Sequence, residues 1–146
     1  MEKRIVDEEI VLTPYYPNYE VTFGWYQDLE LCKQVDNIDH VYTMEKLKSM
    51  YFYLSTHGDC FYIEYKGRLV GDVTLKNDGE ISIVICREYQ NRHIGRRCIK
   101  NIIEMAREKG MPQVKAEIYP FNEQSRHMFL TVGFEHFDNN RYIYNL

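Results

Sequence analysis

At 146 residues, the chain is long enough for one domain with a real hydrophobic core and too short for two. Hydrophobic residues make up 45% and charged residues 27%, a balance that excludes an intrinsically disordered chain. The net charge of −4 argues against nonspecific binding to nucleic acid or to an anionic membrane surface.

The four cysteines are scattered, without a C-x-x-C pair, which is typical of reduced thiols rather than of a disulfide framework. The first residues lack the apolar stretch of a signal peptide, and no run approaches the roughly 18–20 apolar residues of a membrane helix. We therefore expect residues 1–146 to form one soluble, cytoplasmic domain without membrane or nucleic-acid partners.

In the first half of the chain, hydrophobic spacing predicts a strand at 10–12, a helix at 22–35 and a second helix from Thr43 to a stop at Gly58. Two strands at 60–65 and 68–75 follow, joined by a tight Lys66-Gly67 turn. A short hydrophobic run predicts the next strand at 81–86.

In the second half, an amphipathic helix is predicted from Ile94 to Lys109, followed by a strand at 114–119. Asn122 is expected to cap a short helix at 123–132, and two strands at 134–137 and 141–144 complete the chain. Antiparallel strands around an αβα core predict a layered α+β architecture.

The segment 90–97 lies between the strand at 81–86 and the long helix, so the free N–H groups of a helix start follow a short loop. Arg92, Arg96 and Arg97 stand where the helix dipole disfavours positive charge, by roughly 0.3–1 kcal/mol each. This pattern predicts an anion site there, with phosphate as the usual occupant.

Two motifs in this context resemble those of the GNAT superfamily of N-acetyltransferases. Gln90-Asn91-Arg92-His93-Ile94-Gly95 resembles the acyl-CoA loop Q/R-x-x-G-x-G/A, with His93 in place of the first glycine. The motif N-x-x-S/A-x-x-x-Y-x-x-x-G-F is matched by Asn122, Ser125, Phe129, Gly133 and Phe134. Phe129 stands where many members of the family have tyrosine.

The resemblance implies a GNAT-like αβα fold, with a central mixed, mostly antiparallel, twisted sheet of about seven strands and helices on both faces. It also implies acetyl-CoA as cosubstrate and an amine acceptor, and it leaves a homodimer open. No metal is expected, because His57, His127 and His136 show no metal-ligand spacing with cysteine or acid. The implied cofactor contacts are the backbone of Ile83, Val84 and Ile85 for the pantetheine arm, the loop residues Asn91, Arg92, His93, Ile94, Gly95 and Arg96 for the phosphates, and Asn122, Ser125 and Phe129. Arg97 is a further candidate for phosphate, and the His93 ring either donates to phosphate or points to solvent.

The family reaction passes the acetyl group directly to an amine, so a base must first remove a proton from the ammonium. Asp72 is the first candidate for that base, and Glu117 and Glu64 are alternatives; each is equally compatible with a solvent-facing charge. Because phenylalanine cannot donate a proton, the chemistry either proceeds without an acid, since coenzyme A thiolate is a tolerable leaving group, or uses Tyr119 as the acid in place of Phe129. The alternative is a catalytically weak acyl-CoA-binding regulatory module.

The acceptor is expected to be a small molecule or a peptide N-terminus. By the resemblance, its site would lie against the first helices and the neighbouring strands, where aromatic side chains suit a cationic amine. These are Trp25, Tyr26, Tyr51 and Tyr53.

Overall fold

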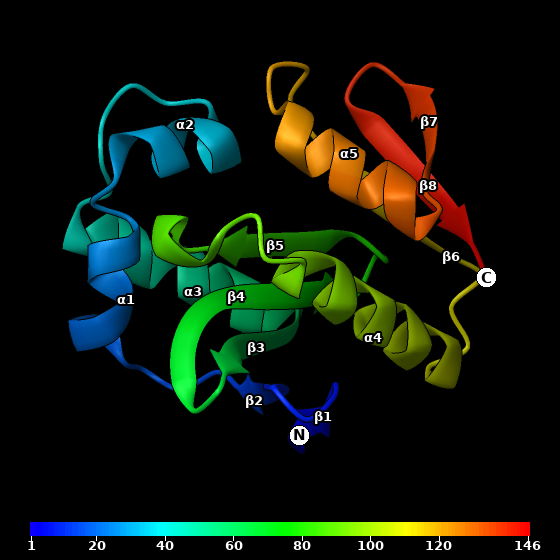
Figure 1. The fold of residues 1–146 in the computed structure, drawn as a ribbon, viewed down its shortest axis with the longest axis horizontal. Coiled ribbons are helices and arrows are strands. Elements are labelled where there is room, and N and C mark those ends of the chain that lie inside the picture. Colours follow the sequence, from blue (N-terminus) through cyan, green and yellow to red (C-terminus); the bar gives the residue numbers. More distant parts are fainter.

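The computed structural model describes residues 1–146, and its eight strands form two antiparallel sheets (Figure 1). The first sheet has the order β1-β2-β3-β4-β5 and the second the order β6-β8-β7. The strands are β1 (Arg4–Ile5), β2 (Ile10–Pro14), β3 (Gly58–Tyr65), β4 (Arg68–Lys76), β5 (Ile81–Ile85), β6 (Gln113–Glu117), β7 (Glu135–Asp138) and β8 (Arg141–Asn145). The α+β fold is therefore confirmed, with the strands divided between two sheets rather than joined in one.

The two sheets meet at a single point between the edge strands β5 and β6. Glu80 and Lys115 form an isolated parallel bridge, in which the Lys115 N–H donates to the Gly79 carbonyl over 3.0 Å. Beyond this bridge β5 and β6 make no further pairing with each other. Both strands therefore keep a free edge that faces the other sheet.

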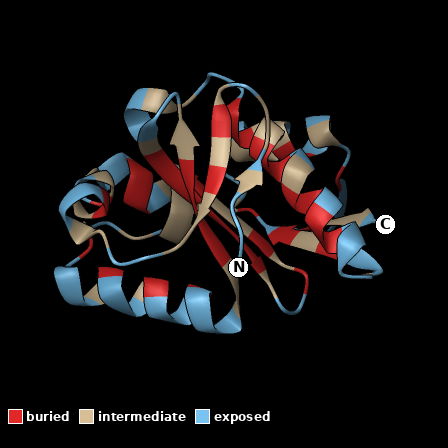
Figure 2. Ribbon diagram, turned by 90° about the horizontal axis from the view of Figure 1, so that it is seen from below, coloured by how far each residue is buried: buried red, intermediate tan, exposed pale blue.

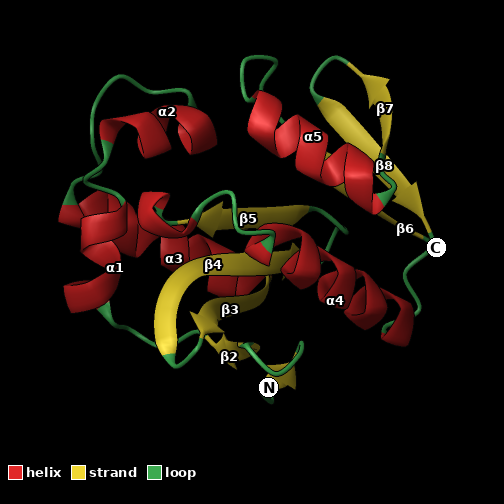
Figure 3. Cartoon of the chain, in the orientation of Figure 1, coloured by secondary structure: helices red, strands yellow, loops and turns green.

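Five α-helices and one 3₁₀ helix cover the sheets, with α3 behind the first sheet and α4 in front of it (Figure 3). They are α1 (Tyr19–Trp25), α2 (Leu29–Asp36), α3 (Met44–His57), η1 (Arg87–Tyr89), α4 (Ile94–Glu108) and α5 (Glu123–Val132). None of these helices has both the length and the apolar character needed to cross a membrane.

Two hydrophobic clusters occupy the two faces of the first sheet, because successive side chains of a strand point to opposite faces. On β3, Phe61 and Ile63 join a cluster of 21 buried residues under α4 and α5, whereas Cys60 and Tyr62 join a cluster of 10 under α1, α2 and α3. Figure 2 shows the buried residues where the helices meet the sheet and the exposed ones on the outer helix faces.

The prediction of one helix at 22–35 is wrong, because the chain breaks there into α1 and α2. Asp28 begins a new helix, since its Oδ1 accepts the Leu31 N–H over 3.1 Å. The strand expected at 114–119 ends at Glu117, where Ile118 bonds instead to the Asn140 carbonyl of the hairpin between β7 and β8. The helix predicted at 123–132 is confirmed.

Candidate functional site

A cavity of about 460 Å³ lies between the free edges of β5 and β6. It is lined by residues 80–85 of the β5 segment, residues 89–96 of the following loop and helix start, residues 117–119, the first turns of α5, and Gln34 and Val35 of α2. This volume is within the range of ordinary ligand sites. We call this cavity the groove.

The loop at one end of the groove presents unpaired backbone N–H groups. The N–H groups of residues 91–96 donate to no backbone carbonyl and no side chain. Asn91 and His93 adopt left-handed conformations, with φ of 63° and 62°, and α4 begins directly after His93. Successive N–H groups of this kind at a helix start form a site for an anion. The backbone here thus has the geometry that the predicted anion site requires, and its occupation by phosphate stays a prediction.

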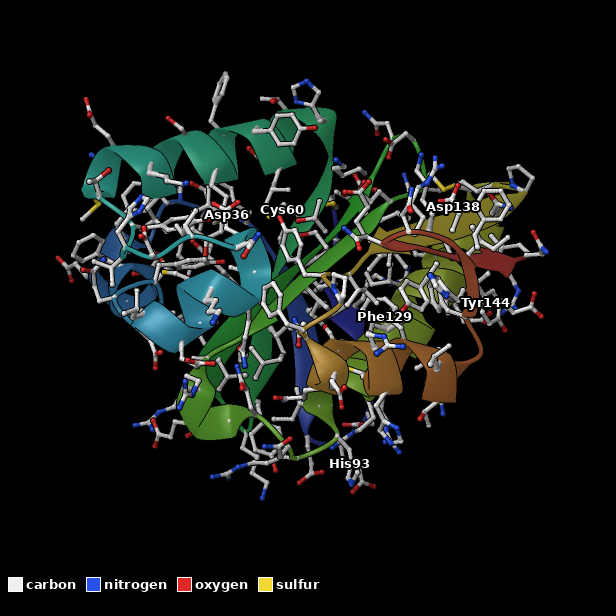
Figure 4. All side chains as sticks on the ribbon, turned by 90° about the horizontal axis from the view of Figure 1, so that it is seen from above. Asp36, Cys60, His93, Phe129, Asp138 and Tyr144 are labelled. Atoms are coloured by element: carbon white, nitrogen blue, oxygen red, sulfur yellow. The ribbon has the colours of Figure 1, made fainter.

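The side chain of His93 is exposed, and Figure 4 shows this residue at the periphery of the molecule. It caps no N–H group of α4. Among residues other than glycine, histidine is one of the three, with asparagine and aspartate, that most readily adopt this left-handed conformation.

The three arginines of the segment have different surroundings. Arg97 is turned away from the groove and forms ion pairs with Asp7 at 2.7 Å and Glu9 at 2.9 Å, so its expected role toward phosphate is wrong. Arg92 donates to the Glu88 carbonyl and stacks over a tyrosine ring. Arg96 lines the groove, and its side chain has no partner in the protein.

Gly95 is buried in the first turn of α4, where that helix meets α5. A Cβ at this position would lie 2.5 Å from the Met128 Sδ and 3.9 Å from a methyl of Ile83. A side chain at position 95 would therefore meet the flexible end of Met128, which would have to shift, so a larger residue would act through the contact between α4 and α5.

The free edge of β5 exposes only alternate backbone groups. The Cys86 N–H donates to the Val70 carbonyl of β4 over 2.8 Å, which fixes the phase of the antiparallel ladder. In this phase Val84 directs its N–H and C=O toward β4, whereas Ile83 and Ile85 direct theirs into the groove. The expectation that Val84 also offers its backbone to a ligand is therefore wrong.

At the start of α5, the Asn122 side chain is already engaged. Its Oδ1 accepts the Ser125 N–H over 3.2 Å, and its Nδ2 donates to the Gln34 carbonyl of α2 over 3.2 Å. Ser125 is partly buried in the groove wall. Phe129 also lines the groove and packs edge-on against Phe134, with ring centroids 5.0 Å apart.

Asp72 lies outside the groove, on the α3 side of β4, and is 1% exposed. The Tyr26 and Tyr51 hydroxyls both donate to its Oδ2, over 2.8 and 2.9 Å. Burial raises the pKa of Asp72 to about 6, against the opposing effect of the two hydroxyls. The alternative of a solvent-facing charge is therefore wrong for Asp72, which does not line the groove.

Two of the residues expected in an acceptor site, Tyr26 and Tyr51, are thus buried against Asp72. Trp25 and Tyr53 also lie outside the groove. Glu64 is another candidate base that the fold places elsewhere, bonded to Thr13 on the neighbouring strand.

Glu117 and Tyr119 are the two catalytic candidates that the structure brings into the groove. Glu117 is an exposed residue of the groove wall, and its carboxylate makes no hydrogen bond or ion pair. Burial raises the pKa of the Tyr119 phenol, and the nearby Asp36 and Glu117 carboxylates add to the effect. Tyr119 therefore keeps its proton at neutral pH, next to an unpaired carboxylate.

Two glutamines contribute to the groove through side-chain contacts that the sequence did not indicate. The Gln90 Nε2 donates to the Ile85 carbonyl, over 2.9 Å, and to the Gln34 Oε1, over 3.3 Å. Gln90 was visible as a motif position, but Gln34 is a single polar residue of a surface helix and carries no sequence signal. No cluster of three or more histidine, cysteine or acidic side chains is arranged to hold a metal ion.

Residues 22–134 match the sequence model described as the acetyltransferase (GNAT) family. A domain from Methanocaldococcus jannaschii has a similar structure, with a TM-score of 0.83 and 21% identity over 96% of this chain and 100% of that one. An acetyl transferase from Salmonella typhimurium, which modifies the N-terminal serine of ribosomal protein L7/L12, gives 0.79 and 10% identity over 99% of both chains. The microcin C7 self-immunity acetyltransferase MccE, in complex with acetyl-CoA and AMP, gives 0.75 and 16% identity over 97% of this chain and 94% of its own.

Proposed function

Because the chain belongs to the GNAT family of acetyltransferases, we propose that it is an acetyl-CoA-dependent N-acetyltransferase acting by direct attack of an amine on the thioester. The observation that carries this proposal is the groove itself. It joins an N–H cradle for phosphate, a free strand edge and an unpaired carboxylate in one continuous cavity. Acetyl-CoA has a phosphate end, an amide-bearing arm and a reactive thioester in the same order.

In this proposal the pyrophosphate accepts hydrogen bonds from the N–H groups of residues 91–96, and Arg96 adds a charge-assisted bond. The pantetheine arm runs along β5 and pairs with the outward backbone groups of Ile83 and Ile85, as an added strand would. Ser125 and Phe129 line the opposite wall. The thioester then lies toward Glu117 and Tyr119.

The Glu117 carboxylate takes a proton from the acceptor ammonium, directly or through one water, because an amine of pKa near 10 is otherwise protonated at neutral pH. The freed nitrogen lone pair attacks the thioester carbonyl carbon and forms a C–N bond. The C–S bond then breaks, the Tyr119 hydroxyl gives its proton to the departing thiolate, and the tyrosinate takes up the second proton, which the new amide nitrogen loses. Tyr119 thereby supplies the acid that Phe129 cannot.

The acceptor in this proposal is a primary amine of a small molecule or of a peptide N-terminus. The Salmonella typhimurium enzyme, which modifies an N-terminal serine, supports the second class by analogy of fold. An unpaired Glu117 in the groove supports either class, since both present a cationic ammonium.

A second candidate function is a binding module that holds acyl-CoA and transfers its acyl group poorly. Phe129 favours it, because its buried ring provides no hydroxyl at the position where many family members have one. Cofactor binding is common to both candidates, whereas turnover separates them.

Two measurements test these candidates in order. Acetyl-CoA should raise the melting temperature of the protein by linkage, and no rise at millimolar concentration would overturn both. Thiol release over a panel of amines and peptides then measures turnover and acceptor class. If none of these amines or peptides caused thiol release, only the binding module would remain as a candidate function.

Glu117→Gln tests the base. We expect kcat to fall by about 10²- to 10⁴-fold, the usual contribution of a general base, with coenzyme A affinity unchanged. Glu135→Gln is the matched control, because Glu135 is an exposed strand carboxylate outside the groove. A kcat for Glu117→Gln equal to that of the control would exclude Glu117 as the base.

A further inference from the structure

The free edge of β5 is already occupied in part by a side chain. The Gln90 Nε2 donates one hydrogen to the Ile85 carbonyl, over 2.9 Å, and the other to the Gln34 Oε1, over 3.3 Å. Both hydrogens of this amide group are therefore used inside the groove. The Ile85 carbonyl is one of the outward groups that an added strand would need.

Gln34 also connects the opposite side of the groove. Its backbone carbonyl accepts the Asn122 Nδ2 over 3.2 Å, so one residue of α2 holds the base of the phosphate loop and the start of α5. Figure 1 shows α2 and α5 facing one another above β5. Of these contacts, only the bond from the Gln90 side chain occupies a backbone group of β5, the Ile85 carbonyl, that a ligand on this strand would use.

We propose that Gln90 and Gln34 form a glutamine latch that takes the place of the cofactor arm in the free protein. This inference rests on the proposed function, since the arm is the amide-bearing part of acyl-CoA. An arm amide N–H that bonds to Ile85 displaces the Gln90 amide, and Gln90 then leaves Gln34. Gln34 is thus a positioning residue that couples the β5 edge to α2.

The latch predicts a gain of affinity when it is weakened. In Gln34→Ala the Gln90 amide loses one acceptor, so the cofactor displaces a weaker bond. We expect coenzyme A to bind about 2- to 10-fold more tightly, the range that one neutral hydrogen bond supplies. A merely structural role for Gln34 predicts unchanged or weaker binding.

Gln34→Glu gives the opposite test, because a carboxylate accepts more strongly from the Gln90 amide than an amide oxygen does. We expect coenzyme A to bind severalfold more weakly. Adenosine 3′,5′-bisphosphate lacks the arm and reports any repulsion between the new charge and the phosphates. Adenosine 3′,5′-bisphosphate should bind wild type and Gln34→Ala with the same affinity. For Gln34→Glu, the change in its binding free energy is subtracted from the change in that of coenzyme A.

The experiment is isothermal titration of the full chain with each ligand, with melting temperatures recorded to check folding. Gln113→Ala is the matched control, since Gln113 is an exposed glutamine outside the groove whose Nε2 donates to the Asn145 Oδ1 over 2.9 Å. Tighter coenzyme A binding by Gln34→Ala alone supports the latch. Binding equal to or weaker than wild type overturns the latch and leaves the proposed function standing, whereas no binding by the wild type overturns both.

Discussion

Adjacent arginines in the first turn of α4 have opposite surroundings. Arg97 is held by Asp7 and Glu9 of the N-terminal segment, whereas Arg96 faces the groove without a partner. A positive side chain at a helix start is disfavoured by the dipole. Nearby carboxylates offset this effect for Arg97, and we propose that a bound phosphate does so for Arg96.

The two arginines therefore predict separable effects. Arg96→Ala should weaken coenzyme A binding several- to tenfold, with the free energy of unfolding unchanged, because only a ligand contact is lost. Arg97→Ala should lower the free energy of unfolding by up to about 1 kcal/mol, with binding unchanged, because only partly exposed ion pairs are lost. Calorimetric titration and urea unfolding of both variants check this, and the reverse pattern would contradict the assignment.

Asp72 accounts for part of the high tyrosine content of the chain. Its carboxylate is buried and accepts hydrogen bonds from the hydroxyls of Tyr26 and Tyr51. Tyr26 directly follows α1, and Tyr51 lies in α3. A buried carboxylate is tolerated only with such partners. This contact fixes two helices on one face of the sheet and leaves Asp72 remote from the groove.

The raised pKa of Asp72 predicts that the folded protein loses stability as the pH rises. Between about pH 4 and pH 6 the folded protein holds the proton and the unfolded chain releases it, so the free energy of unfolding falls as pH rises. The loss is on the order of 2–3 kcal/mol for a rise of this size. Asp72→Asn removes the titration and keeps an acceptor for the hydroxyls.

Urea unfolding of wild type and Asp72→Asn from pH 4 to pH 7 tests this. The variant should gain stability relative to wild type across that window, while other carboxylates titrate alike in both proteins. A difference that does not depend on pH would show that Asp72 is ionised normally in the fold.

At the scale of elements, the groove depends on how closely α4 approaches α5. Gly95 allows that approach, because a side chain there would overlap the Met128 sulfur. The same turn of α4 carries the N–H groups of the phosphate cradle. Helix packing and anion binding are therefore linked through one residue.

Gly95→Val should displace α5 and weaken coenzyme A binding at least tenfold, with a loss of stability of about 1–3 kcal/mol from overpacking. Because the overlap is with a side chain, Met128→Ala should restore part of both losses in the double variant. Titration calorimetry and thermal unfolding of the single and double variants measure this. Strictly additive losses would show that the helix contact is not the cause.

At the scale of the whole molecule, the second sheet is attached to the first by one bridge and by packing. β3 has neighbours on both sides and helices on both faces, whereas much of the β7 and β8 surface is exposed. Units with fewer buried contacts open at lower free energy.

We therefore expect the β8 amides to exchange by an opening of lower free energy than the β3 amides. Coenzyme A spans the gap in our proposal, so at 100 times its dissociation constant it should raise the β8 opening free energy by about 2.7 kcal/mol. Hydrogen exchange with and without coenzyme A measures this. If β3 and β8 opened with equal free energies in the free protein, the second sheet would not be a separate unfolding unit.

Periodicity, caps and motifs were sufficient for most elements. The helix at 123–132, the hairpin around Lys66-Gly67 and the long helix after the loop follow from local signals, so sequence alone located them. The break between α1 and α2 was missed because apolar spacing continues across it. The free N–H groups before and at the start of α4 were predictable for the same local reason, since such groups belong to every helix start.

Tertiary structure alone decided which candidates share a cavity. Asp72 and Glu117 are both strand carboxylates in sequence, yet one is sealed under tyrosines and the other is exposed in the groove. Arg96 and Arg97 are neighbours in sequence, yet only one faces the groove. Sequence determined most elements and the conformation of the helix start at α4, because those depend on residues within a few positions. Side-chain partners more than 40 positions apart, such as Gln34 and Gln90, depend on how the sheets and helices pack, and only the fold brings them together.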